Sequence, residues 1–261
     1  MPVARRFLRA HGLAAANYAG EVIPFGTGAV VAVLAVVHYG IVELLAALGI
    51  GTFAEFRSLL GQSAAALVLV FAAGWTDDCI GDRTVKGMAG HLRAWRQTRT
   101  PSTGIVKAGV VAVAALWVVW HGSRSWGEAA FDWLTIVLSA NAVNLLDVRP
   151  GRAWKGFLAG AVPIVAAEPA LAAGTWLVPA TAAGIALMPG DLRGKHMLGD
   201  SGSNLLGFML GCSFAAAAPI GLQATALAVL VAMHRTAERS SISAWIEKHK
   251  WVRWLDRYGR V

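Results

Sequence analysis

The sequence predicts an all-α protein, a polytopic membrane bundle of about eight transmembrane helices with both termini in the cytoplasm. Hydrophobic residues make up 56% of the chain and charged residues 15%, whereas a soluble domain carries about 25% charged residues. Apolar runs recur along the chain, and the basic residues gather in alternate connecting segments. We expect one integral membrane domain over 1–261, with an N-terminal loop at 1–26, the bundle at 27–234, and a cytoplasmic or interfacial tail at 235–261.

The first 26 residues are polar and basic, and they include Gly20, Pro24 and Gly26. Proline and closely spaced glycines favour a loop over a membrane span. Arg5 and Arg9 lie in this segment without an apolar core and a small-residue cleavage site after them, so no cleaved signal peptide is predicted.

Apolar runs predict the membrane spans. A crossing helix needs about 20 residues, and the first four runs meet this length. The last four form two tight pairs, broken at 168–169 and 219–221, and each member is short enough that one is compatible with a re-entrant segment. The runs cover residues 27–48, 59–75, 104–121, 129–146, 156–171, 174–188, 203–219 and 221–234.

The distribution of Lys and Arg predicts the orientation. The two tails and the connecting segments 76–103, 147–155 and 189–202 hold 20 of the 23 basic residues. Since basic loops stay on the cytoplasmic side, this face is expected to be cytoplasmic in the inner (plasma) membrane. The same pattern explains the net charge of +8 without a nucleic-acid partner, which would need a basic patch on a soluble face.

Acidic residues on the same predicted face indicate a phosphate and magnesium site. Asp200 lies between glycines and hydroxyls at the start of an apolar run, and Asp77 and Asp78 end another. Adjacent carboxylates repel unless a cation lies near, and Mg²⁺ is held by one or two carboxylates with substrate phosphates. The alternatives are a polar turn around Asp200 and a solvated acidic turn in which the pair contacts Arg83.

Three polar residues end the predicted span 129–146. The spacing of Asn141, Asn144 and Asp147 puts them on one helical face, which should look into the bundle and not into lipid. Arg149 and Arg152 follow, and guanidinium groups suit phosphate. Anchoring of the loop by its positive charge is the alternative for these two arginines.

The tail begins with His234 and Arg235 and continues as an amphipathic segment over 244–255. Tryptophans among lysines and arginines in that segment predict an interfacial helix that lies on lipid headgroups. A lone histidine such as His234 more often has a structural role.

The order of these motifs resembles the polyprenyl-phosphate N-acetylhexosamine-1-phosphate transferase superfamily. That superfamily includes the translocase that makes lipid I of peptidoglycan and the GlcNAc-1-phosphate transferases that initiate cell-surface polymers. The resemblance covers nearly the whole chain. It rests on Asn-x-x-Gly-x-x-x-Pro-x-Gly-x-Gly at 17–28, Asp77-Asp78, Thr-Gly-x-x-Lys at 103–107, Asn-x-x-Asn-Leu-x-Asp at 141–147, Gly-Asp-Ser-Gly-Ser at 199–203 and the C-terminal His/Arg cluster.

The resemblance implies ten helices, of which this chain lacks the first and the last, and transfer of a sugar-1-phosphate from a nucleotide sugar to a polyprenyl phosphate with release of UMP. It also implies Mg²⁺, with Mn²⁺ as a substitute, and is compatible with a homodimer. Asp200 would be the main metal ligand, helped by Asp77. Asp77 and Asp78 would position or deprotonate the acceptor phosphate, and Lys107 would offer a cation. Residues expected to contact the nucleotide sugar are Asn17, Asn141, Asn144, Asp147, Arg149, Arg152, His234 and Arg235.

Departures from the family pattern bear on the donor sugar. Residues 148–150 replace the family's Gly and second Asp, and His234 stands alone where the lipid I translocase has a His-rich loop. A small UDP-N-acetylhexosamine, most simply UDP-GlcNAc, therefore fits best. Direct attack and an aspartyl-phosphate intermediate both stay open. The alternatives to an enzyme are a catalytically altered homologue that acts as a membrane scaffold and a small-solute transporter.

Overall fold

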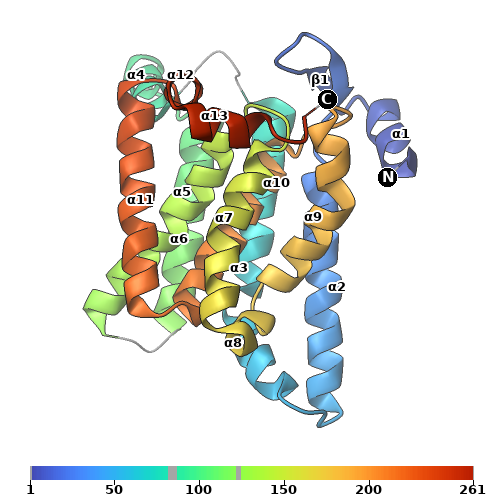
Figure 1. Ribbon diagram of the computed structural model, residues 1–261, viewed down its shortest axis with the longest axis vertical. Coiled ribbons are helices and arrows are strands. Elements are labelled where there is room, and N and C mark those ends of the chain that lie inside the picture. Colours follow the sequence, from blue (N-terminus) through green and yellow to red (C-terminus); the bar gives the residue numbers. More distant parts are fainter. Residues whose placement is uncertain (1, 82–86, 122–124, 261) are drawn as a thin grey trace.

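The computed structural model describes residues 2–81, 87–121 and 125–260. Within these residues the chain forms 13 helices and one two-stranded hairpin, so the predicted all-α bundle is confirmed. Figure 1 shows the long helices running along one axis, with most of the short helices and the hairpin gathered at one end. We call this the site end, because α10 (Gly199–Ala217), which starts with the 199–203 motif, begins there.

The elements follow one another with short connections. The hairpin pairs β1 (Ala14–Ala16) with β2 (Val22–Pro24) in antiparallel register, Ala15 opposite Ile23. The helices are α1 (Pro2–Ala10), α2 (Gly28–Ala47), α3 (Phe53–Ile80), α4 (Gly87–Thr98), α5 (Thr103–His121), α6 (Trp126–Leu146), α7 (Arg152–Ala167), α8 (Pro169–Ala173), α9 (Leu177–Leu192), α10 (Gly199–Ala217), α11 (Ile220–Arg239), α12 (Ile242–Lys248) and α13 (Lys250–Arg257).

Five helices of the described chain are long and apolar enough to cross a membrane: α2, α3, α5, α6 and α11. Helices α7 and α9 have 16 residues each, which is short for a full crossing. Helix α10 has 19 residues, but its first turns are polar. The chain is thus membrane-associated by its helices, and the number of eight crossings stays a prediction.

Both tails differ from the expected form. Residues 1–26 were expected to be a loop, yet they contain α1 and the hairpin, because Pro2 suits a first helical turn and the side chain of Asn17 closes the hairpin turn. The expected single amphipathic segment at 244–255 is two helices. The backbone is extended at His249 (φ −105°, ψ 105°), and this break allows α13 to fold back onto α7.

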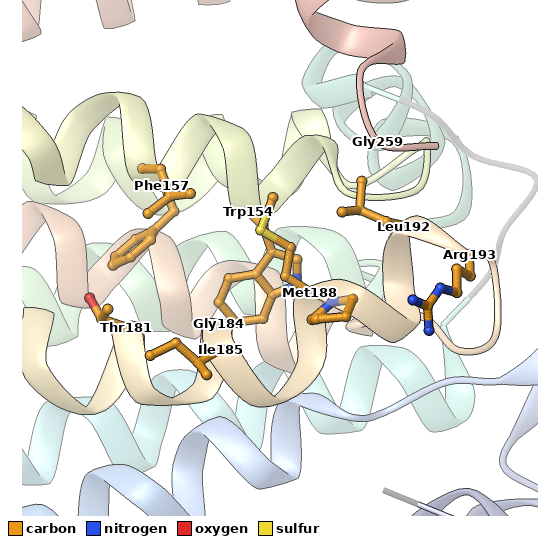
Figure 2. A pocket seen from close by; sticks show the side chains of 11 residues that line it. Trp154, Phe157, Thr181, Gly184, Ile185, Met188, Leu192, Arg193 and Gly259 are labelled. Carbon is orange, nitrogen blue, oxygen red and sulfur yellow. The ribbon is translucent and has the colours of Figure 1, made fainter. Parts of the chain in front are cut away.

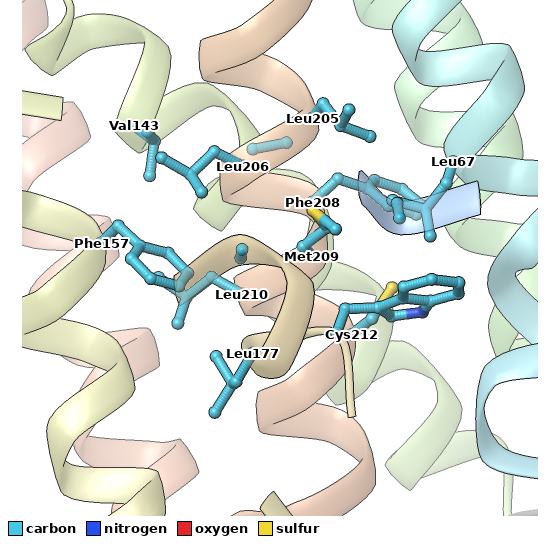
Figure 3. Close-up of a cluster of buried hydrophobic side chains, with 14 of the residues drawn as sticks. Leu67, Val143, Phe157, Leu177, Leu205, Leu206, Phe208, Met209, Leu210 and Cys212 are labelled. Atoms are coloured by element: carbon cyan, nitrogen blue, oxygen red, sulfur yellow. The ribbon is translucent and has the colours of Figure 1, made fainter. Parts of the chain in front are cut away.

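Helix α10 is the centre of the bundle. Every residue from Ser201 to Phe214 is buried, and the helix contacts α2, α3, α6, α7, α8 and α9. Figure 3 shows its side chains pointing to several sides at once, with Leu206 near Val143 and Phe208 near Leu67. A helix that is apolar all round belongs in the interior of a bundle, so α10 sets the frame on which the other helices pack.

Small residues let α6 approach α10 closely. A Cβ atom on Gly207 would lie 2.4 Å from the carbonyl oxygen of Ser139, and one on Gly211 would lie 2.6 Å from the Cα atom of Ile136. Glycines four residues apart are a common device for close packing of membrane helices. This packing fixes the height of α6 against α10, and with it the height of the polar residues at the site end.

Candidate active site

Three helices bring an ammonium group between two carboxylates at the site end. Lys107 of α5 donates from Nζ to Oδ2 of Asp77 in α3, at 2.6 Å, and to Oδ2 of Asp200 in α10. The side chains of Lys107 and Asp77 are only 11% and 14% exposed, whereas that of Asp200 is 36% exposed. Buried charges persist in proteins when they are paired. We call these three residues the acid–lysine centre.

Asp78 holds the start of α10. Its carboxylate accepts hydrogen bonds from the backbone N–H of Asp200 at 2.7 Å and of Ser201 at 2.9 Å, and from the Ser201 hydroxyl at 2.6 Å. The first N–H groups of a helix lack partners within it, and a carboxylate there also favours the helix dipole. Gly199 makes room for this contact, since its φ is +75° and a Cβ atom would lie 2.7 Å from Oδ2 of Asp78.

Two further glycines let α2 and α3 clamp the same turn of α10. A Cβ atom on Gly28 would lie 2.3 Å from the Cα atom of Gly202, and one on Gly74 would lie 2.6 Å from the Cα atom of Ser201. The Thr27 hydroxyl donates to the carbonyl of Met197 at 2.9 Å, just before α10. Gly28 of the 17–28 motif and Gly202 of the 199–203 motif are therefore explained by close contact of backbones.

The amides of α6 connect it to two neighbouring helices. Oδ1 of Asn144 accepts from the Ser203 hydroxyl of α10 at 2.8 Å. Asn141 contacts Nε2 of His234 in α11 through Nδ2 at 2.9 Å. Because Nδ1 of His234 faces the carbonyl of Leu230 at 2.7 Å, Nδ1–H donates there, and Nε2 accepts from the Asn141 amide.

Asp147 lies close to the carboxylates of Asp78, Asp191 and Asp200, and we call these four residues the acid cluster. Burial raises the pKa of the Asp147 carboxyl well above the usual value, and the nearby carboxylates of Asp191, Asp200 and Asp78 raise it further. The backbone N–H of Gly199 hydrogen-bonds the Asp147 carboxylate and offsets part of this effect. A further cation near these carboxyls would favour their ionised forms, because an opposite charge lowers the pKa of a carboxyl.

Two other predicted contact residues, Asn17 and Arg149, have partners that are not members of the acid cluster. Oδ1 of Asn17 accepts from the N–H groups of Ala19 and Glu21, at 2.8 and 3.0 Å, in the hairpin turn. The guanidinium of Arg149 lies 4.3 Å from the ring centre of Tyr18. Arg235 is exposed on α11.

Arg152 has structural partners. Its side chain is buried, and it donates to both carboxylate oxygens of Asp256 in α13, at 2.8 and 3.0 Å, and to the Ser243 hydroxyl at 2.9 Å. This bidentate pair occupies the guanidinium that the motif resemblance assigned to the nucleotide sugar. Arg83, the alternative partner of the acid pair, lies outside the described residues.

Two buried groups near the site were not singled out from the sequence. Asp191 at the end of α9 accepts from the backbone N–H of Gly151 at 2.9 Å. A carboxylate directly after Pro189-Gly190 at the end of an apolar run was the available signal. His196 is 2% exposed, and neither ring nitrogen has a hydrogen-bond partner among the described residues. Burial, aided by the Arg5 guanidinium, lowers the pKa of His196 to about 4.

An apolar cavity of about 510 Å³ lies between α7 and α9 (Figure 2). Trp154, Phe157, Ile185 and Met188 form much of its wall, with Arg193 at the α9 end. The indole N–H of Trp154 is buried without a partner in the described part of the chain. No residue of the acid–lysine centre lines this cavity.

The donor set is compatible with a substrate-bound magnesium ion. No group of three or more His, Cys, Asp or Glu side chains suited to a metal occurs among the described residues. Mg²⁺ needs only one or two carboxylates when substrate phosphates and water complete its octahedron, and Asp77 and Asp200 supply two.

Comparison of the chain with family models, curated proteins and solved structures finds no match.

Proposed function

We propose that the protein is a plasma-membrane enzyme that transfers a sugar-1-phosphate from a UDP-N-acetylhexosamine to a polyprenyl phosphate and releases UMP. UDP-GlcNAc is the simplest donor, and cell-envelope glycan synthesis is the process. The observation that supports this most is the Lys107 ammonium shared by Asp77 and Asp200 from three helices. The order of the motifs along the chain supports the reaction class.

The chemistry asks the site to bring two anions together. An oxygen of the lipid phosphate attacks the β-phosphorus of the donor, the bond to the α-phosphate oxygen breaks, and UMP leaves with the electron pair. Lys107 lies where it can offset phosphate charge. Mg²⁺, or Mn²⁺ in its place, would be held by Asp200 and Asp77 and would supply further neutralisation of the phosphates.

The other predicted site residues have supporting roles in the reaction. Asp78 orients Asp200, because it holds the backbone N–H of that residue. Asp77 positions the acceptor phosphate through the shared ammonium. Asn141, Asn144 and Asp147 lie along the α6 end, on the side assigned to the nucleotide sugar.

The test is UMP release by purified protein with undecaprenyl phosphate and a panel of UDP-sugars. We expect release with UDP-GlcNAc, its loss with EDTA, and its return with Mg²⁺ or Mn²⁺. Release with UDP-MurNAc-pentapeptide and with none of the simple UDP-N-acetylhexosamines would contradict the donor. If folded protein released no UMP with any nucleotide sugar, the scaffold alternative would be favoured.

A further inference from the structure

Helix α13 presents an apolar face to its surroundings. Trp251, Trp254, Leu255 and Tyr258 are 85%, 60%, 55% and 66% exposed. Their spacing of three and four residues puts them on one side of the helix, which we call the outer face. Exposed aromatic side chains in such a row are unfavourable in water, but they suit the boundary between lipid headgroups and acyl chains.

Basic side chains flank the outer face. Lys250, Arg253 and Arg257 line a hollow of about 440 Å³ together with Trp254 and Tyr258. Glu247 balances part of this charge, through contacts to Arg257 at 3.0 Å and Arg253 at 4.0 Å. Three cations against one acid leave the hollow positive, and guanidinium and ammonium groups are donors suited to phosphate.

The face of α13 opposite the outer face is held by hydrogen bonds to the start of α7. Asp256 is 6% exposed and forms the bidentate pair with Arg152. Nζ of Lys155 donates to the carbonyls of Leu255, Asp256 and Tyr258, at 3.0, 2.7 and 2.7 Å, which closes the C-terminal end of the helix.

The chain after α13 is tied to the same loop. Nε of Arg260 donates to the carbonyl of Pro150 at 2.8 Å, and the guanidinium also contacts Asp256. Pro150 lies in the loop 147–151, which begins at Asp147 and ends with Gly151, the donor to Asp191. In Figure 1, α13 lies across the site end of the long helices. A force that positions α13 therefore also positions this loop.

We propose that the outer face and basic hollow of α13 bind the headgroups of anionic phospholipids in the surrounding bilayer, and that this contact holds the 147–151 loop in place beside the acid cluster. The choice of occupant follows from charge, because a positive hollow beside an apolar row matches a phosphate headgroup above acyl chains. The lipid contact does not depend on the proposed transferase reaction, since it can be measured on protein that turns nothing over.

Native mass spectrometry of the full-length protein measures the lipid contact, with phosphatidylglycerol and phosphatidylcholine as probes. We expect tighter binding of phosphatidylglycerol. The double variant Lys250→Gln/Arg253→Gln should bind it about 30-fold more weakly, because each basic side chain near an anionic surface contributes about a factor of five. Arg6→Gln/Arg9→Gln on α1 removes the same charge from another short helix at the site end and should weaken binding by less, because these arginines do not line the hollow. Equal binding of the two lipids, or equal loss in both double variants, would overturn the lipid site.

Hydrogen exchange of the loop amides measures the coupling. In nanodiscs with phosphatidylglycerol we expect slower exchange over 147–151 than in nanodiscs with phosphatidylcholine alone. Asp256→Asn should remove this difference while phosphatidylglycerol still binds, and Lys250→Gln/Arg253→Gln should remove both. Identical loop exchange of the wild-type protein in the two lipids would refute the coupling, whatever the outcome of the UMP assay.

Discussion

Lys107 determines how the two carboxylates of the centre coexist. Its ammonium contacts Asp77 and Asp200 at once, so its removal leaves two like charges facing each other in a largely buried place. Breaking a buried ion pair by removing one partner costs about 3–5 kcal/mol. We expect the lower end of that range here, since Asp200 keeps contact with solvent.

The variant Lys107→Met should unfold at a lower temperature than wild type. MgCl₂ should raise the unfolding temperature of the variant more than that of wild type, because a divalent cation can replace the lost ammonium between the carboxylates. Thermal unfolding in detergent with MgCl₂ or with KCl of equal ionic strength measures this. A variant that responds alike to both salts would argue against a cation site at Asp77 and Asp200.

Removing the charge of Asp78 is expected to lower stability, whereas removing the charge of Asp200 is expected to lower turnover. Asp78 makes three hydrogen bonds to the first turn of α10, so Asp78→Asn should lower the unfolding temperature, at a cost of about 1 kcal/mol for a damaged helix cap. Asp200→Asn should keep the fold and lower turnover by at least ~10²-fold, as expected for a main electrostatic stabiliser. Full turnover in folded Asp200→Asn protein would remove this residue from the site.

The Arg152–Asp256 pair predicts how tail docking depends on pH. Burial raises the pKa of Asp256, but the hydrogen bonds and charge of Arg152, with the charge of Arg260, outweigh burial and hold that pKa below its usual value. A carboxyl with a depressed folded pKa contributes stability above its unfolded pKa of about 3.9 and loses it as the pH falls further. The protection of the α13 amides against hydrogen exchange, measured relative to the intrinsic exchange rate, should therefore stay constant from pH 8 to 5. Loss of this protection near pH 6 would contradict the prediction.

At the scale of elements, the close approach of α6 and α10 depends on the absence of side chains. A Cβ atom at Gly207 would meet the backbone of Ser139 at 2.4 Å, whereas one at Gly109 in α5 would meet nothing within 4 Å. Gly207→Ala should thus destabilise the fold by about 1–3 kcal/mol through overpacking. Gly109→Ala should be neutral or stabilising by up to about 1 kcal/mol, since alanine favours a helix. Equal unfolding temperatures of the two variants would show that α6 and α10 are not in tight contact.

The apolar runs predicted the helix positions well, but they do not indicate how the helices are arranged in space. The run 27–48 became α2 (Gly28–Ala47), because a long apolar stretch has few alternatives to a helix in a membrane. No local pattern indicated that α10 is central, since this depends on backbone contacts at Gly28, Gly74 and Gly207 with distant segments. The docking of Asp256 on Arg152 joins residues 104 positions apart, and the sequence between them gives no sign of it.

At the scale of the whole molecule, the polar residues and the chain ends share one end of the bundle. Asp77, Lys107 and Asp200 come from three helices and Asp147 from the loop after α6, and their separation along the chain hides their proximity. Short amphipathic helices surround them, with Val3 and Phe7 exposed on α1 and Trp95 on α4, as on α13. This arrangement fits a polar site at the level of lipid headgroups, where a water-soluble and a lipid substrate can meet.

The last prediction concerns the orientation of that end. The two chain ends lie near the site end in Figure 1, and the segments predicted to lie on this side hold 20 of the 23 basic residues. Retention of basic loops in the cytoplasm therefore predicts a cytoplasmic site. Green fluorescent protein fused after the last residue should fluoresce in cells, and alkaline phosphatase fused there should be inactive. Alkaline phosphatase inserted in the connection 48–52, at the other end of α2, should be active. The reverse pattern would put the acid–lysine centre outside the cytoplasm, away from nucleotide sugars, and would exclude the proposed reaction.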